Sequence, residues 1–409
     1  SGKASSHGSP LGNEEISLVR KKLKWNSQPF KIPDEIEYKW REIGDKGEQL
    51  ENDWLKKISK KNPKIKNELY QSNEKLDLSD LEKLIRQEKE KHFESKPSLA
   101  TRQCSMSVIE KISALFPQLI GGSADLSGSN NTKTNNSKII NSKNFNGNYI
   151  HYGVREHGMA AVMNGLALYG GIIPYGGTFL IFSDYCKPSI RLSALMGLKV
   201  IYIFSHDSIG LGEDGPTHQP IEQLTGLRAI PNLNVFRPAD INETFECWEI
   251  ALKSENTPSA IALSRQKVPY INPSKSKENK CEKGAYVVNL TSHESNVTLV
   301  ASGTEVELAL KVQDKLKENN IHSKVVSMPC MELFDKQPED YRKDILEENS
   351  LIITLEAGSV MSWQKYIKNR GLNLGIDKFG ESAPYKEVYK HFKLSEEDIT
   401  NFIQKKLRK

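Results

Sequence analysis

From about residue 96 onward, the hydrophobic positions of the chain follow two alternating patterns. Short continuous apolar runs predict buried strands, and the segments between them carry apolar residues three to four positions apart, which predicts helices. Strands that alternate with helices are typical of a parallel α/β sheet with right-handed crossovers. The predicted strands here are 147–154, 171–177, 198–204, 231–238 and 258–265, and the predicted helices are 156–170, 178–197 and 241–254.

The same alternation begins again after residues 272–284, a polar and charged stretch that predicts a linker. Beyond it, the apolar runs at 296–303, 322–329 and 350–358 predict strands, and 304–320 and 362–370 predict helices. We therefore expect a second, smaller α/β domain with its own parallel sheet.

The other segments are mainly polar. Residues 13–25 and 79–93 predict helices, and Asn13 is the expected cap of the first. Residues 130–148, rich in Asn, Lys and Ser, predict a loop because they offer no apolar stripe to bury. The predicted organisation is an N-terminal helical and linker segment followed by two parallel-sheet α/β domains, with boundaries at 1–65, 66–275 and 276–409.

Composition narrows the function classes. A chain of 409 residues is too long to fold around one compact core, so more than one domain is expected. The 57 basic and 52 acidic side chains give a net charge of only +5. Both signs are interleaved along most of the chain, which disfavours a nucleic-acid partner, and no stretch approaches the ~18 apolar residues of a membrane span. Five scattered cysteines predict small core residues in a reducing compartment, and we expect the cytoplasm.

Residues 206–220, "HDSIGLGEDGPTHQP", follow a predicted buried strand and contain a G-x-G-x-x-G pattern. A dinucleotide turn is disfavoured, because Glu213 and Asp214 lie inside the pattern and Pro216 follows it. A loop at the carboxyl edge of a parallel sheet is nevertheless a common place for a ligand. His206 and Asp214 could orient hydroxyl groups or relay protons there. A hydrogen-bonded loop histidine without a ligand is an equal alternative.

Two other stretches contain residues that could be functional, and each also has a purely structural explanation. Glu156 lies where a predicted strand gives way to a helix, so it is either a functional carboxyl group or a partner of the helix dipole. Phe179, Phe182 and Tyr185 are three residues apart, which predicts one helical face. Such a face usually packs in a core, but it can also wall a flat aromatic ligand.

Two arginines adjoin apolar segments. Arg102 lies in "ATRQCS" and Arg265 in "LSRQ". The planar fork of a guanidinium group suits recognition of phosphate or carboxylate. Structural ion pairs are an equally common use of such arginines, so the sequence leaves both roles open.

Together these stretches resemble the transketolase family, thiamine-diphosphate enzymes that move a two-carbon ketol unit between sugar phosphates. The strings "HGSPLG", "GGSADLSGSN", "YIHYGVREHGMAA", "PYGGTFLIF" and "GIDKFGESAP" occur in family order, as does the long string that contains residues 206–220. The resemblance implies the tail of the diphosphate-binding domain and a linker at 1–65, the pyrimidine-binding domain at 66–275 and the C-terminal domain at 276–409. It also implies a homodimer and a place in the pentose phosphate pathway.

The family's G-D-G motif for metal and diphosphate does not occur in this chain. The resemblance therefore implies that the ligands of Mg²⁺ or Ca²⁺ and of the diphosphate lie in an N-terminal part outside this chain. We expect a fragment of a longer protein that is inactive alone. Its expected partners are ketose and aldose phosphates and a second copy or the diphosphate-binding half.

The resemblance also assigns roles to matched positions. Glu156 matches the glutamate that hydrogen-bonds the pyrimidine ring and promotes formation of the thiazolium carbanion. The aromatic wall matches Phe179, Phe182 and Tyr185, and Asp125 matches a residue near the cofactor. The positions that contact the sugar phosphate in the family are matched by Arg102, Ser129, His206 and Arg265. The positions that contact the sugar hydroxyl groups are matched by His7 and Asp214. His218 matches a histidine near the cofactor's amino group.

Rival functions remain. Dihydroxyacetone synthase shares most of these motifs, and relative rates with formaldehyde and aldose phosphates would separate it from a transketolase. Deoxyxylulose-phosphate synthase fits residues 206–220 less well. A non-catalytic dimerising fragment is the alternative from a different class.

Overall fold

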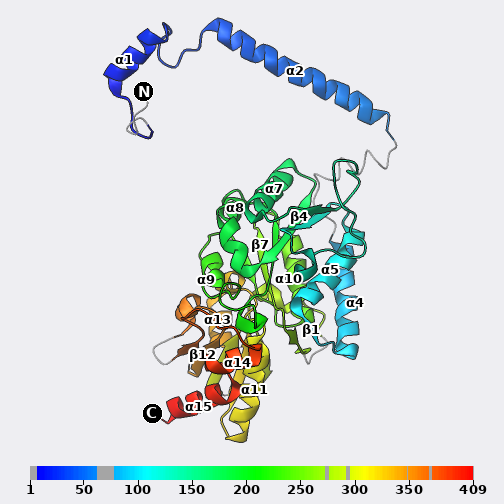
Figure 1. The fold of residues 1–409 in the computed structure, drawn as a ribbon, viewed down its shortest axis with the longest axis vertical. Helices are drawn as coiled ribbons and strands as arrows, with labels where there is room; N and C mark the ends of the chain where they lie inside the picture. The colour runs from blue at the N-terminus through cyan, green and yellow to red at the C-terminus, as the bar shows by residue number, and fades with distance from the viewer. Residues whose placement is uncertain are drawn as a thin grey trace. The chain divides into compact units, whose positions relative to one another are not determined.

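The computed structural model describes residues 7–61, 78–271, 276–291, 295–347, 349–367 and 371–408. The chain divides into two compact units, Ser1–Gln71 and Ser72–Lys409 (Figure 1). The predicted boundary at 65/66 lies outside the described residues. Each unit is considered by itself below.

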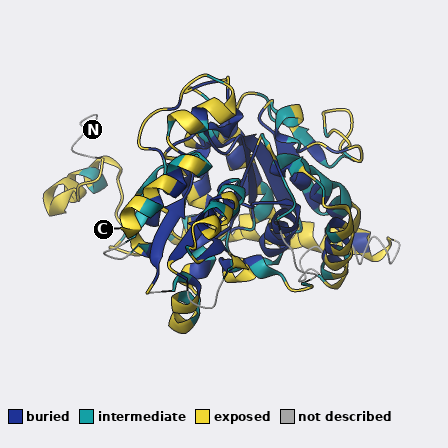
Figure 2. Cartoon of the chain, turned by 90° about the horizontal axis from the view of Figure 1, so that it is seen from below, coloured by how far each residue is buried: buried dark blue, intermediate teal, exposed yellow. Residues whose placement is uncertain are grey.

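The described part of the first unit, residues 7–61, contains two helices, α1 (Gly12–Lys22) and α2 (Asp34–Ser59). The helix predicted near residue 13 is confirmed, but Asn13 is not its cap, because the helix begins one residue earlier and no side chain caps it. Acidic residues in the first turn and basic residues in the last turn of each helix complement the helix dipole. Nearly all side chains of these helices are exposed (Figure 2).

The first α/β domain is built on a six-stranded sheet of order β3-β2-β4-β5-β7-β6, in which every pair is parallel. Every residue of β5 and β7 is buried, which explains their continuous apolar runs. The strands are β2 (Leu119–Ser123), β3 (Tyr149–His151), β4 (Ile173–Phe179), β5 (Ile201–Ser205), β6 (Asn234–Phe236) and β7 (Ser259–Leu263).

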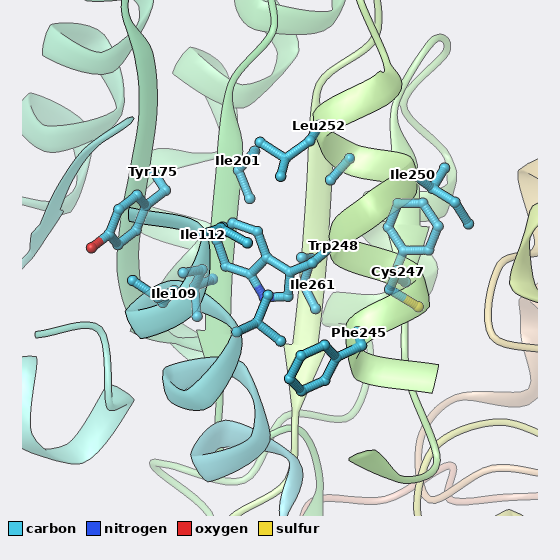
Figure 3. Packing of buried hydrophobic residues seen from close by; sticks show 14 of the residues in the cluster. Ile109, Ile112, Tyr175, Ile201, Phe245, Cys247, Trp248, Ile250, Leu252 and Ile261 are labelled. Carbon is cyan, nitrogen blue, oxygen red and sulfur yellow. The ribbon is translucent and has the colours of Figure 1, made fainter. Parts of the chain in front are cut away.

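Helices cover both faces of this sheet. Trp248 lies at the centre of one core, between α5, α10 and the sheet, and its indole Nε1 donates a hydrogen bond to Ser105 Oγ at 2.9 Å (Figure 3). The helices on that side are α4 (Ser79–Ser95), α5 (Thr101–Leu115) and α10 (Ile241–Lys253); a second core on the other face involves α7 (Glu156–Tyr169), α8 (Ser183–Leu195) and α9 (Gln223–Arg228). Two short strands, β1 (Leu99–Ala100) and β8 (Lys267–Val268), form a separate antiparallel pair. The remaining short elements are α6 (Ser127–Asn130), η2 (Leu180–Phe182), η3 (Ile209–Leu211) and η4 (Lys280–Lys283).

The second α/β domain has a five-stranded sheet of order β13-β12-β10-β11-β9. Four strands are parallel, but the edge strand β9 is antiparallel to β11, so the sheet is not parallel throughout as predicted. The short connection from β9 to β10 leaves no room for a crossover helix, which a parallel orientation would need. The strands are β9 (Tyr286–Leu290), β10 (Val297–Ala301), β11 (Ser323–Ser327), β12 (Leu351–Leu355) and β13 (Leu372–Leu374).

Of the two helices predicted in this domain, the one at 304–320 is confirmed, and four further α-helices of the described residues were not predicted. The helix predicted at 362–370 is not an α-helix in its described part, because residues 362–366 belong to a 3₁₀ helix, η5 (Val360–Tyr366), where Trp363 Nε1 donates to Glu356. Residues 368–370 lie outside the described residues. The α-helices are α11 (Glu305–Glu318), α12 (Met331–Asp335), α13 (Glu339–Leu346), α14 (Tyr385–His391) and α15 (Glu396–Leu407).

Two expectations from composition can be compared with the structure. All five cysteines are free and buried, which confirms their expected place in the cores. Among the described segments, no helix is both long enough and apolar enough to cross a membrane.

Candidate active site

The carboxyl ends of the parallel strands place most of the predicted site residues at one edge of the first sheet. Chain order reverses between the neighbouring strands β2 and β4, and such a switch point is where open α/β sheets bind ligands. Asp125 follows β2, Glu156 follows β3, Phe179 ends β4, His206 follows β5 and Arg265 follows β7.

The three aromatic residues form a continuous stack. The ring centroids of Phe179 and Phe182 are 5.7 Å apart, and those of Phe182 and Tyr185 are 5.8 Å apart. The prediction of one helical face is wrong, because the rings come from the end of β4, from η2 and from α8. Phe179 is buried, whereas Tyr185 is 65% exposed, so the stack runs from the core to the surface.

Glu156 is the first residue of α7, as the sequence predicts. Its side chain is only 9% exposed, although α7 begins at the edge of the sheet. Helix α7 packs on α8, and the Glu156 charge contributes to raising the pKa of Cys186 after burial, the main cause. The carboxyl group thus lies near the helix that carries Tyr185.

His206 is held in a strained, buried position. Its backbone is left-handed (φ 60°), and its ring stacks on Phe179 with centroids 3.8 Å apart. Its Nδ1 lies 2.9 Å from Ser205 Oγ, which accepts a hydrogen bond from Asn130 Nδ2 at 2.7 Å. Burial, assisted by the charges of Arg102 and Arg265, lowers the pKa of His206 to about 3. The imidazole is therefore neutral near pH 7.

Arg102 and Arg265 lie close enough to His206 to influence its protonation, and they also repel each other. Arg102 Nη1 donates to the backbone oxygen of Ser129 at 2.7 Å, and Arg265 Nη1 donates to Leu211 O at 3.2 Å. Burial lowers the pKa of Arg102, and its Nε has no hydrogen-bond partner among the described residues. Neither guanidinium forms a salt bridge with a described carboxylate. We call Arg102, His206 and Arg265 the cationic cluster, after the charges of its two arginines; His206 itself is neutral near pH 7.

The remaining predicted residues are less closely gathered. His218 lies edge-on to Phe179 and Phe182, with ring centroids 6.2 and 5.7 Å away, and its Nδ1 is 2.9 Å from Thr217 Oγ1. Asp214 and Asp125 are exposed. His7 is exposed in the first unit, whereas all other predicted site residues belong to the second.

The sequence interpretation missed the residues that support the cluster. Ser123 Oγ donates to Asn130 Oδ1 at 3.0 Å and thereby extends the chain of hydrogen bonds through Ser205 to His206. Arg237, directly after β6, binds Asp207, the neighbour of His206. Ser205 and Arg237 each come directly after an apolar run in the sequence, and this position could have marked them as residues at the edge of the sheet.

Three family models match the chain. They describe the transketolase pyrimidine-binding domain at residues 97–270, the transketolase-like C-terminal domain at 284–395 and the transketolase thiamine diphosphate-binding domain at 1–77. The chain belongs to the transketolase family. This confirms the family inferred from the motifs, and the model of the diphosphate-binding domain matches the start of the chain.

Individual transketolases also match this chain over nearly its whole length. The chain is 45% identical to a transketolase from Sinorhizobium medicae, covering 97% of this chain and 57% of that one, and 43% identical to one from Cereibacter sphaeroides, covering 98% and 60%. A transketolase mutant from Pichia stipitis matches with a TM-score of 0.88 and 35% identity, covering 98% of this chain and 60% of that chain. The chain thus spans less than two thirds of the length of these relatives.

Proposed function

We propose that this chain carries the pyrimidine and sugar-phosphate side of a transketolase, acting within a longer protein or with a partner. The observation that supports this most is the cationic cluster, which has no carboxylate partner among the described residues and lies beside an aromatic stack. A phosphate dianion would supply the missing counter-charge, and a flat heterocycle would fit against the stacked rings.

The residues present fit thiamine diphosphate. The buried carboxyl of Glu156 would hydrogen-bond the pyrimidine ring, and Phe182 and Tyr185 would contact that ring, with Asp125 nearby. When bound, the cofactor supplies the nucleophilic carbon that takes part in breaking and forming the carbon–carbon bond. The chain's own task is to hold a proton at Glu156 and to exclude water with the aromatic wall.

The sugar phosphate would lie over the cationic cluster. Arg102 and Arg265 donate from planar forks, and neutral His206 donates one hydrogen bond without adding charge. Ser129, whose backbone already holds Arg102, adds a hydroxyl group. We assign sugar hydroxyl contacts to His7 and Asp214, and a place near the cofactor's amino group to His218.

An exposed apolar surface on α7 and α8 supports association with a second subunit. Val162, Leu168, Tyr169, Leu192 and Leu195 are all exposed on these adjacent helices. Exposed apolar side chains gathered on neighbouring helices are typical of a protein interface. We propose a dimer here, with Mg²⁺ or Ca²⁺ and the diphosphate held by residues outside this chain, in the cytoplasm.

The direct test is a coupled assay with xylulose 5-phosphate and ribose 5-phosphate, thiamine diphosphate and Mg²⁺, on the longest natural protein that contains this chain. We expect turnover that Glu156→Ala lowers by about 10²–10⁴-fold, the range for a lost proton-transfer group. Ala161→Ser, which changes an exposed residue of the same helix that lies outside the proposed interface surface, is the matched control. Near-wild-type turnover of Glu156→Ala, or higher activity with formaldehyde than with ribose 5-phosphate, would contradict the proposal.

The chain alone is the second arm of the assay. We expect little or no turnover from it with the same cofactor and metal. Full turnover would show that this chain holds the diphosphate and metal itself.

A further inference from the structure

A buried ionic network joins the two α/β domains directly behind His206. Arg237 is fully buried; its Nε donates to Asp207 Oδ2 at 2.9 Å, and its Nη1 donates to Ser302 O at 2.8 Å and to Glu305. Asp207 belongs to the loop after β5, whereas Ser302 and Glu305 follow β10 of the C-terminal domain. One guanidinium therefore connects the C-terminal domain to the loop that carries His206.

A second layer fixes this arrangement. Glu356, after β12, accepts two hydrogen bonds from Arg228 at 2.6 and 2.8 Å and one from Ser302 Oγ at 2.5 Å. Trp363 Nε1 donates to the same carboxylate at 2.8 Å. Because Ser302 bonds both Glu356 and Arg237, the two layers form one network. Charged groups buried in this way are stable only with nearly complete pairing.

The backbone of His206 needs such support. A non-glycine residue at φ 60° is strained by about 1 kcal/mol or more and persists where the surroundings over-determine it. Both neighbours of His206 are fixed through their side chains, Ser205 by Asn130 and Asp207 by Arg237. The second of these supports depends on the C-terminal domain.

The far end of the same loop is also attached to the C-terminal domain. Gln219 is buried, and its Nε2 donates to Gly212 O within the loop and to Glu381 O, both at 2.9 Å. Ser382 Oγ donates to Glu213 O at 2.5 Å. A Cβ at Gly380 would lie 1.6 Å from Gln219 Oε1, so only glycine permits this close approach.

We propose that the C-terminal domain positions the substrate loop 206–220, with Arg237 and Gln219 as the positioning residues that hold its two ends. Arg237 fixes the backbone on which His206 is carried. Gln219 fixes the turn that presents Asp214. The expected effect on the binding of a sugar phosphate rests on the proposed function. The attachment of the loop to the C-terminal domain is a separate claim about this chain.

The test uses Gln219→Ala and Arg237→Lys in the full chain, with hydrogen exchange of the amides in 206–220 as the first readout. Gln313→Ala is the matched control for Gln219→Ala, because Gln313 is equally buried and its Nε2 also donates to a backbone oxygen, Ser323 O at 2.9 Å. Lys89→Arg is the control for Arg237→Lys, because Lys89 is also a buried cation in an ion pair, with Glu246, but lies outside this network.

We expect loop exchange to rise about tenfold or more in Gln219→Ala and Arg237→Lys, because local opening becomes easier. The two controls should leave it within about twofold of the wild type. Equal loop exchange in a variant and its control would overturn the proposal. If Arg237→Lys does not fold, the pair Gln219→Ala and Gln313→Ala decides.

The second readout is the dissociation constant of ribose 5-phosphate, measured by calorimetry on the same variants. Gln219→Ala should raise it severalfold while Gln313→Ala leaves it unchanged. If the wild-type chain binds no ribose 5-phosphate, the proposed function fails at this step. The exchange result still tests the loop attachment separately.

Discussion

The two sheets of this chain use the same edge for opposite purposes. At the carboxyl edge of the C-terminal sheet, Glu305 and Glu356 are fully buried and paired with arginines of the neighbouring domain. At the carboxyl edge of the first sheet, Arg102 and Arg265 have no described carboxylate partner and repel each other. The first kind of charge joins two domains, and the second kind is available to an anion. Pairing, rather than position on the fold, separates a structural charge from a ligand-binding one.

The largest effect should come from breaking a paired charge. Arg228→Met leaves the buried carboxylate of Glu356 without its bidentate partner, and we expect the free energy of unfolding to fall by about 3–5 kcal/mol. Arg102→Met, which removes an unpaired arginine, should change it by no more than about 1 kcal/mol. Urea denaturation measures both. An equal loss of unfolding free energy in the two variants would contradict the distinction between paired and unpaired arginines.

A smaller effect should appear in the pH dependence of stability. His206 has a pKa of about 3 against an ordinary 6.5, so the folded chain takes up its proton much less readily than the unfolded chain. Its contribution to stability is fully present above pH 6.5 and is lost as the pH falls towards about 3. Between pH 7 and pH 5 the loss should be on the order of 2 kcal/mol.

His206→Asn, which keeps a residue tolerant of the left-handed backbone, should remove this part of the pH dependence. Glu356 titrates in a different window. Burial raises the pKa of Glu356, but Arg228, Arg237 and Ser302 together lower it to about 2, so its contribution disappears only as the pH falls from about 4.5 to 2. Denaturation curves at pH 7, 5 and 4 separate the two groups. An unchanged pH profile in His206→Asn would refute the assignment of a depressed histidine pKa.

The smallest effect concerns the exposed end of the aromatic stack. Tyr185→Ala should change the free energy of unfolding by no more than about 0.5 kcal/mol, because the ring is 65% exposed. Phe179→Ala is the buried counterpart and should cost about 3–5 kcal/mol. Thermal denaturation of the two variants checks this. A large loss in Tyr185→Ala would mean that the ring supports the fold.

Local patterns were sufficient to predict much of the fold. The strands β4, β5, β7, β10, β11 and β12 are found at the predicted segments, because buried parallel strands have long apolar runs that differ clearly from helical periodicity. The helices were predicted only in part: α1, α4, α7, α8, α10 and α11 overlap predicted segments, whereas α2, α5, α9 and α12 to α15 do not. The antiparallel edge strand β9 was missed, since its outer end is exposed and its run is short. Spacing alone also misplaced Phe179 and Phe182, because a strand end followed by a 3₁₀ turn can present residues three apart on one side, as a helix does.

The candidate site was predicted only in part. Glu156, His206 and Arg265 come shortly after the ends of strands with apolar runs, so their place at the sheet edge could be inferred from order along the chain. The pairing of Arg237 with Glu305 could not, because it depends on how two domains pack, and no local spacing records that. The lack of a partner for Arg102 is likewise visible only in three dimensions.

The central claim is that the cationic cluster binds the phosphate of a sugar phosphate, and a calorimetric comparison of ribose 5-phosphate with ribose tests it most directly. We predict that the chain binds ribose 5-phosphate but not ribose, and that Arg102→Met or Arg265→Met raises the dissociation constant about tenfold or more, as expected for a lost charged hydrogen bond. Lys267→Met, a neighbouring exposed cation outside the cluster, should leave it unchanged. Equal binding of both sugars, or unchanged affinity in both arginine variants, would contradict the account.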